Sequence, residues 1–136
     1  MKTVKLLILV CTLIVAGFPL TAQDTEKSEN QEISKSDGVH VYYFHFSRRC
    51  ATCQTVEKVA KEAVQDLYGD KVIFSAHNLD EAEGEKKGSE VGVSRQTLLI
   101  VGGDTKIDIT NEGFMNAKSQ PEKLKKIIKE KVDPLL

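Results

Sequence analysis

The sequence predicts an α/β layer fold with a central mixed four-stranded sheet, and three observations lead to this prediction. Residues 39–46 form a strand-like run that is apolar on both faces, as expected of a strand covered on both sides. An amphipathic, helix-like run follows over residues 54–67, and the chain ends in two short strand-like runs and a lysine-rich amphipathic stretch. The order strand, helix, strand, weak helix, strand, strand, helix (βαβαββα) suits a sheet with helices on both faces.

The first half of this pattern is a pair of crossover units. Within residues 54–67 apolar side chains recur at helical spacing, and Gly69 ends the helix in the manner of a C-cap. Residues 71–76 indicate a second strand, whereas residues 80–91 are charged, contain two glycines and predict only a weak helix. Two right-handed crossovers of this kind are expected to build parallel strand pairing.

The second half of the pattern is a hairpin followed by a helix. Residues 97–101 and 106–110 predict two strands around a tight turn at residues 102–104, with Lys106 and Asp108 pointing outward from the second strand. Pro121 then opens the last helix, which carries one apolar face and lysines over the rest.

The first 22 residues predict an export signal peptide. Lys2 and Lys5 supply a basic start, residues 6–16 an apolar stretch, and residues 20–22 a small-residue cleavage site. An uncleaved membrane anchor is the alternative, but the apolar stretch is shorter than the ~20 residues that span a bilayer. We therefore expect an exported protein, periplasmic or extracellular, with no stable membrane insertion after cleavage.

The length and charge of the remaining chain limit its organisation and its partners. Residues 23–38 are almost wholly polar and predict a flexible tether, which leaves residues 39–136 as one compact domain. Without Lys2 and Lys5 the 19 basic residues fall to 17 against 20 acidic ones, a formal net charge of about −3. This balance is no signature of nucleic-acid or membrane-surface binding. No long apolar edge requires a dimer, so a monomer is expected.

The motif Cys50-Ala51-Thr52-Cys53 lies between the first strand and the first helix and points to dithiol chemistry. Two cysteines with this spacing at a helix start can close a small disulfide ring, and the unpaired N–H groups of the helix give the first one thiolate character. Arg48 and Arg49 precede the motif and add positive charge. Signal cleavage removes Cys11, which leaves only these two thiols in a compartment that is usually oxidising.

Three interpretations of the two cysteines compete: a catalytic dithiol, a structural disulfide and half of a metal site. A structural disulfide across four residues removes little chain entropy and therefore stabilises weakly. Zinc normally needs four ligands, and the chain offers only His40, His45 and His77 as further soft donors. The dithiol is favoured, with a non-enzymatic soft-metal (copper or zinc) binding or relay protein as the alternative. A third possibility is an adaptor whose lysine-rich last helix docks a partner.

Residues 39–136 resemble the thioredoxin-like superfamily on three stretches. These are CATC after the first core strand, Asn78-Leu79-Asp80 closing the next strand, and QTLLI at residues 96–100 entering the hairpin. Residues 44–53 are also similar to small exported bacterial proteins described as thioredoxin-like nitrophenyl compound nitroreductase subunits. The resemblance implies a minimal thioredoxin-like fold and a thiol–disulfide oxidoreductase that exchanges disulfides with a protein partner and needs no cofactor. Nothing in the chain resembles a flavin or nicotinamide site, which argues against nitroreduction.

The resemblance assigns roles to particular residues. Cys50 becomes the nucleophile that forms a mixed disulfide with the partner, and Cys53 resolves it. Arg48 and Arg49 then stabilise the Cys50 thiolate or contact an acidic partner, unless they are merely solvated loop cations. Thr52 caps the helix or lines the site, or is an ordinary helix-start residue. No metal ligand is assigned.

The chain departs from the thioredoxin pattern at three positions. Gln96 stands where thioredoxins keep a cis-proline that presents backbone to the substrate, and a cis bond without proline costs ~3 kcal/mol, so a trans bond is predicted there. Phe44 stands at the position of the buried acid, and Ala76 at that of its partner lysine.

Proton transfer to Cys53 then needs another group. His45, close before the motif, and His77, near the end of the second strand, are candidates because imidazole titrates near neutrality. The alternative for each is a packed or surface histidine with no role. Tyr42 and Tyr43 are interpreted as core residues rather than site residues.

Overall fold

The structure is a computed structural model that describes residues 38–136. The expected signal peptide at residues 1–22 and all but the last residue of the expected tether lie outside the described residues. The elements in chain order are β1 (Val39–His45), α2 (Ala51–Tyr68), β2 (Val72–Asn78), α3 (Ala82–Val91), β3 (Thr97–Gly102), β4 (Thr105–Asp108), α4 (Thr110–Asn116) and α5 (Pro121–Val132). None of the helices within residues 38–136 is long and apolar enough to cross a membrane.

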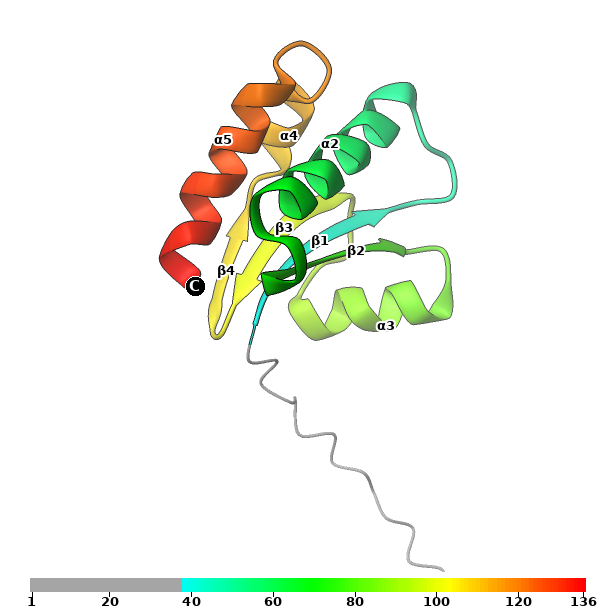
Figure 1. Ribbon diagram of the computed structural model, residues 1–136. Helices are drawn as coiled ribbons and strands as arrows, with labels where there is room; N and C mark the ends of the chain where they lie inside the picture. Colours follow the sequence, from blue (N-terminus) through cyan, green and yellow to red (C-terminus); the bar gives the residue numbers. More distant parts are fainter. Residues whose placement is uncertain (1–37) are drawn as a thin grey trace, which may run out of the picture. The chain divides into compact units, whose positions relative to one another are not determined.

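The four strands form one mixed sheet in the order β2-β1-β3-β4 (Figure 1), which confirms the predicted fold class. β1 is the central strand, as its two apolar faces predict. It pairs parallel with β2 and antiparallel with β3, and β3 pairs antiparallel with β4.

The expected parallel pairing at the second crossover is wrong. β2 ends with Asn78 opposite His45, and β3 begins with Thr97 opposite Phe44, so both lie at the same end of the sheet. The connection that contains α3 therefore starts and finishes at the same end of the sheet. It does not carry the chain back to the opposite end, as a parallel crossover would. A strand that leaves from the end at which its predecessor stopped must run antiparallel to it.

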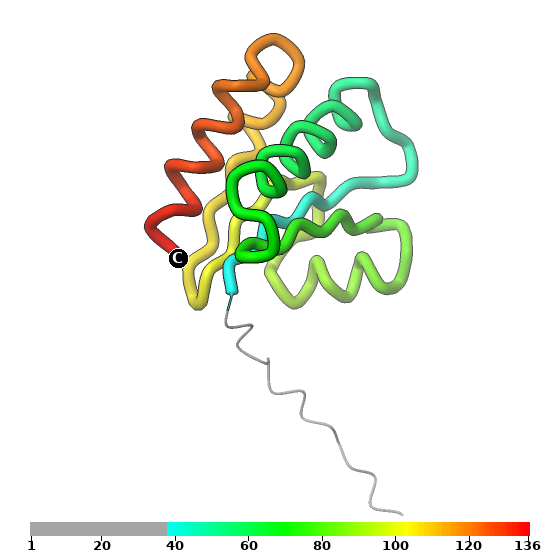
Figure 2. The backbone as a smooth tube through the Cα atoms, viewed as in Figure 1, coloured from blue at the N-terminus to red at the C-terminus, as the bar shows by residue number. Residues whose placement is uncertain are grey.

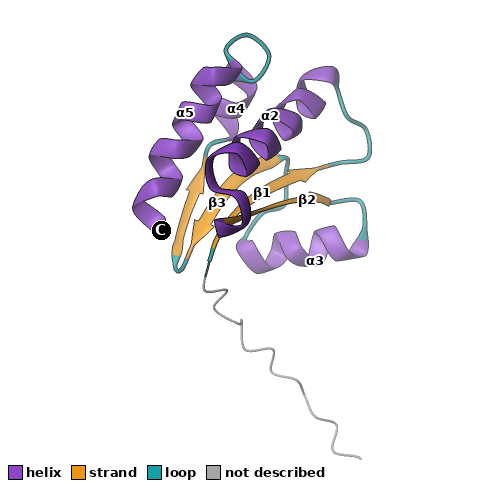
Figure 3. Ribbon diagram, viewed as in Figure 1, coloured by secondary structure: helices purple, strands orange, loops and turns teal. Residues whose placement is uncertain are grey.

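The helices lie on both faces of the sheet, as predicted (Figure 3). Side chains alternate along β1, so Val41 and Tyr43 pack against α2 and α5, whereas Tyr42 and Phe44 belong to a second cluster on the opposite face. That second cluster includes Val91 at the end of α3. One face thus carries α2, α4 and α5, and the other carries α3.

The helix α4 was not predicted from the sequence. The second hairpin strand ends at Asp108 rather than at residue 110, and Thr110 begins the helix instead. The Thr110 hydroxyl accepts the Leu98 N–H at 2.9 Å, which holds the start of α4 against β3. Gly113 permits the close packing, since a Cβ there would lie 3.2 Å from a Leu98 methyl and 3.3 Å from a Val56 methyl.

Candidate redox site at the start of α2

Cys50 and Cys53 form a disulfide at the end of the central strand, with their Cα atoms 5.1 Å apart. Cys50 is exposed and is itself the N-cap of α2, and its Sγ accepts the backbone N–H of Cys53 at 3.1 Å. The helix therefore starts at Ala51, three residues before the amphipathic run. Thr52 lies inside the first turn, so the suggestion that it caps the helix is wrong.

The two sulfurs have different surroundings. An N–H group and the positive end of a helix dipole face the exposed Cys50 sulfur, and both stabilise a thiolate. Cys53 is only 7% exposed, and burial favours the neutral thiol. A cysteine pair at disulfide distance with this asymmetry is compatible with redox function.

Tyr43 belongs to the site as well as to the core. Its side chain is fully buried, as predicted, but its hydroxyl donates to the Cys53 carbonyl oxygen at 3.0 Å and accepts from Gln96 Nε2 at 2.6 Å. Burial raises the pKa of Tyr43, and the Gln96 hydrogen bond and nearby Arg49 only partly offset that rise. The hydroxyl therefore keeps its proton at neutral pH, and the expectation that Tyr43 stands apart from the site is wrong.

Gln96 lies directly before β3 and reaches the buried cysteine. Its Oε1 is 3.9 Å from Cys53 Sγ. The peptide bond before Gln96 is trans, as are all others within residues 38–136, and this confirms the prediction. Gln96 thus approaches the disulfide with its side chain.

The loop that carries the dithiol is tied to the loop after β2, and the two run close together at one end of the sheet (Figure 2). Asp80 accepts the Ser47 N–H at 2.7 Å, and Asn78 Nδ2 donates to the Ser47 hydroxyl at 3.0 Å. The Leu79 N–H also donates to the His45 carbonyl at 2.7 Å. The stretch Asn78-Leu79-Asp80 therefore fixes the segment that leads into Cys50.

The bond between Ser47 and Asp80 gives a testable pH dependence. The Ser47 N–H, and next its hydroxyl, hold the pKa of Asp80 below the ordinary value of 3.8. Because the folded pKa is depressed, the contribution of this bond is present above the unfolded pKa and is lost as the pH falls through the folded one. The Ser47 amide proton shift, followed by NMR, should titrate with a midpoint below 3.8. Asp80→Asn should remove this step, and a wild-type midpoint at or above 3.8 would contradict the assignment.

The two arginines before the motif differ in their contacts. Arg49 forms an ion pair with Glu57 of α2, and both side chains are about one-quarter exposed. This pairing offsets the charge that Arg49 was expected to direct at Cys50. Arg48 is exposed, so its side chain is open to solvent beside the dithiol.

The two candidate histidines lie on different faces of the sheet. His45 ends β1 on the face of Tyr43, with its ring centroid 6.0 Å from the Tyr43 ring, and its Nδ1 lies 3.0 Å from the Phe46 carbonyl. His77 stacks on Phe44 at 5.4 Å on the α3 face, and burial lowers its pKa. The structure therefore brings His45 to the end of the sheet that carries the dithiol, and keeps His77 on the opposite face.

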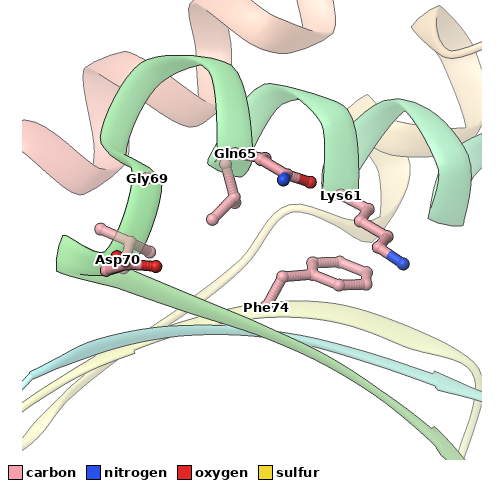
Figure 4. A pocket seen from close by; sticks show the side chains of 7 residues that line it. Lys61, Gln65, Gly69, Asp70 and Phe74 are labelled. Carbon is pink, nitrogen blue, oxygen red and sulfur yellow. The ribbon is translucent and has the colours of Figure 1, made fainter.

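A pocket of about 210 Å³ lies away from the disulfide, between the second half of α2 and β2 (Figure 4). Its lining includes Lys61, Gln65, Asp70 and Phe74. None of these residues contacts the cysteines. Within residues 38–136 no group of three or more His, Cys, Asp or Glu side chains is placed to hold a metal ion.

The fold and site define an α/β protein with a mixed four-stranded sheet and a CxxC pair at the start of the helix after its central strand. Neither a protein-family model nor a curated protein matches the chain. Solved structures do match, among them one described as "Structure of a malarial protein", with 22% identity over 65% of this chain and 96% of that chain. Its TM-score is 0.45, and a likeness at this level supports no statement about function.

Proposed function

We propose that this protein is an exported, thioredoxin-like thiol–disulfide oxidoreductase that acts on a protein partner. The observation that carries the proposal is the contrast between the two sulfurs: an exposed Cys50 whose Sγ accepts a helix N–H, and a Cys53 that is 7% exposed. In such a pair, the exposed sulfur can react with a partner in solution. The buried sulfur can react only with the other cysteine of the motif. Export and the identity of the partner as a protein rest on the sequence.

In the direction that reduces the partner, the reaction has two exchange steps. The Cys50 thiolate attacks one sulfur of a partner disulfide, which forms a mixed disulfide and releases the other partner sulfur as a thiolate. Cys53 then loses its proton to solvent or to a nearby base and attacks the Cys50 sulfur. This closes the intramolecular disulfide and releases the second partner thiolate, so two electrons pass from the dithiol to the partner. The same steps in reverse oxidise the partner.

The local contacts support this order of events. The Cys53 N–H and the helix start stabilise negative charge on Cys50, both as the attacking thiolate and as the leaving group of the reverse step. The Ser47 N–H donates to Asp80 and the Ser47 hydroxyl accepts from Asn78, and these two bonds tie down the segment that leads into Cys50. His45 lies at this end of the sheet on the face of Tyr43, whereas His77 lies on the other face, and His45 is therefore the candidate base for the Cys53 proton.

Equilibration with glutathione tests the proposal. The signal-free protein is incubated with defined ratios of reduced and oxidised glutathione, quenched and alkylated, and the dithiol fraction is read by mass spectrometry. We expect one reversible two-electron transition, and we expect Cys50 to be alkylated at least about tenfold faster than Cys53. Thiols that show no reversible transition, or that react only after a chelator is added, would overturn the proposal and favour soft-metal binding.

A further inference from the structure

The amide of Gln96 faces two groups at once, and the hydrogen bonds decide which end faces which. Tyr43 has one hydroxyl proton, and that proton is donated to the Cys53 carbonyl oxygen at 3.0 Å. Toward Gln96 the hydroxyl can therefore act only as an acceptor, which places Nε2 at 2.6 Å from it. The amide oxygen is then left directed at Cys53, 3.9 Å from its Sγ.

This orientation matters differently in the two redox states. In the disulfide, Cys53 Sγ carries no hydrogen, so the amide oxygen makes no hydrogen bond to it. In the dithiol, the Cys53 thiol gains a proton, and the amide oxygen is already placed to accept it, at a distance within reach of an S–H donor. The Tyr43 bond to the Cys53 carbonyl does not depend on the presence of that proton.

We propose that Tyr43 and Gln96 are positioning residues that selectively stabilise the reduced form, by holding the amide oxygen of Gln96 as an acceptor for the Cys53 thiol. The pair therefore sets the equilibrium between dithiol and disulfide without touching the attacking sulfur. Burial strengthens the effect, because Tyr43 is fully buried and Cys53 nearly so, and water does not readily replace a lost partner there.

This inference rests on the proposed function only in that the two cysteines must interconvert reversibly between dithiol and disulfide. The balanced reaction uses glutathione as the redox partner. Two glutathione thiols reduce the Cys50–Cys53 bond, and one molecule of oxidised glutathione forms. The two glutathione protons pass to the two protein sulfurs, or to solvent where a protein sulfur stays a thiolate.

The test compares the glutathione equilibrium constant of three variants with that of the wild type. Tyr43→Phe removes the group that orients the amide, and Gln96→Met removes the acceptor while keeping the length of the side chain. Each should shift the equilibrium toward the disulfide by about threefold to tenfold, as expected for one hydrogen bond. This shift corresponds to a potential lower by about 15–30 mV. Tyr42→Phe is the matched control, since Tyr42 is a buried tyrosine on the opposite face of the sheet, and it should leave the constant unchanged.

A double variant makes the test sharper. If both residues act through the same thiol bond, Tyr43→Phe should add little to the shift that Gln96→Met already causes. Variants that match the Tyr42→Phe control, or that move toward the dithiol, would overturn the inference while the proposed function stands. A wild-type protein without a reversible transition would instead remove the proposed function. If Tyr43→Phe does not fold, Gln96→Met alone decides, because its side chain lies in a loop and is only partly buried.

Discussion

Replacement of Cys50 by serine is expected to lower the rate of disulfide exchange by at least about a thousandfold. The hydroxyl of serine is not ionised at neutral pH and is a far weaker nucleophile toward sulfur than a thiolate. Folding should be little affected, because the lost disulfide closes a short ring and stabilises weakly, Cys50 is exposed, and serine is also a favourable N-cap residue. The measurement is the rate of reaction with oxidised glutathione or with a disulfide-linked model peptide.

Cys53→Ser is the informative control for this prediction. It leaves the attacking sulfur in place and removes the one that resolves the mixed disulfide. The variant should therefore react once with the model peptide and accumulate as a covalent adduct, visible as a mass increase that a reductant reverses. Equal loss of the first step in both variants would show that the sulfurs are not divided into an attacking and a resolving one.

Gly84→Ala is expected to destabilise the protein by about 3 kcal/mol, at the upper end of the usual cost of overpacking. A Cβ on Gly84 would overlap the backbone carbonyl of Asn78, so that either α3 or the loop after β2 must move. The better helix propensity of alanine, about 1 kcal/mol, acts in the opposite direction and is too small to offset this clash. Urea unfolding at equilibrium measures the difference.

The matched control for the glycine prediction is Gly38→Ala. A Cβ at Gly38 has no atom within 4 Å, and the change should alter the free energy of unfolding by no more than about 0.5 kcal/mol. A loss in Gly84→Ala no larger than in Gly38→Ala would mean that α3 shifts on the sheet at no cost. The Ser47 amide shift reports separately on whether the loop of Asp80 moves, since that amide donates to Asp80.

The sequence predicts those elements whose own residues show a hydrophobic pattern typical of a strand or a helix. β1 is apolar on both faces and is indeed central, and α2 shows helical spacing and ends at Gly69, which is its C-cap. The direction of β3 was not predictable, because it depends on where the α3 connection returns the chain and not on the residues of the strand. From the sequence, Gly84 predicts only a weakness of α3, whereas the structure places it against the backbone of Asn78 at the end of β2.

The sequence predicts the two reactive cysteines of the site. It does not predict the side chains that hydrogen-bond around them. The CxxC spacing before a helix identified Cys50 and Cys53, but a buried tyrosine has the same sequence signature whether its hydroxyl is used or not. A usable signal did exist for Tyr43. Alternation along β1 places it on the face that α2 covers, as the last buried residue of the strand in that apolar cluster. The helix α4 carried no such signal, since its seven residues include glycine and two asparagines.

The unequal covering of the two faces of the sheet has a consequence for motion. One face is buried under α2, α4 and α5 around a large apolar cluster, and the other under α3 alone, around the small cluster of Tyr42, Phe44 and Leu99. The local unfolding event that costs the least free energy is therefore the detachment of α3 from the sheet. Such an opening would loosen Asp80, and with it the segment before Cys50, while Cys53 stays packed in α2. The order of the loop in front of the attacking sulfur would then be governed from the far side of the sheet.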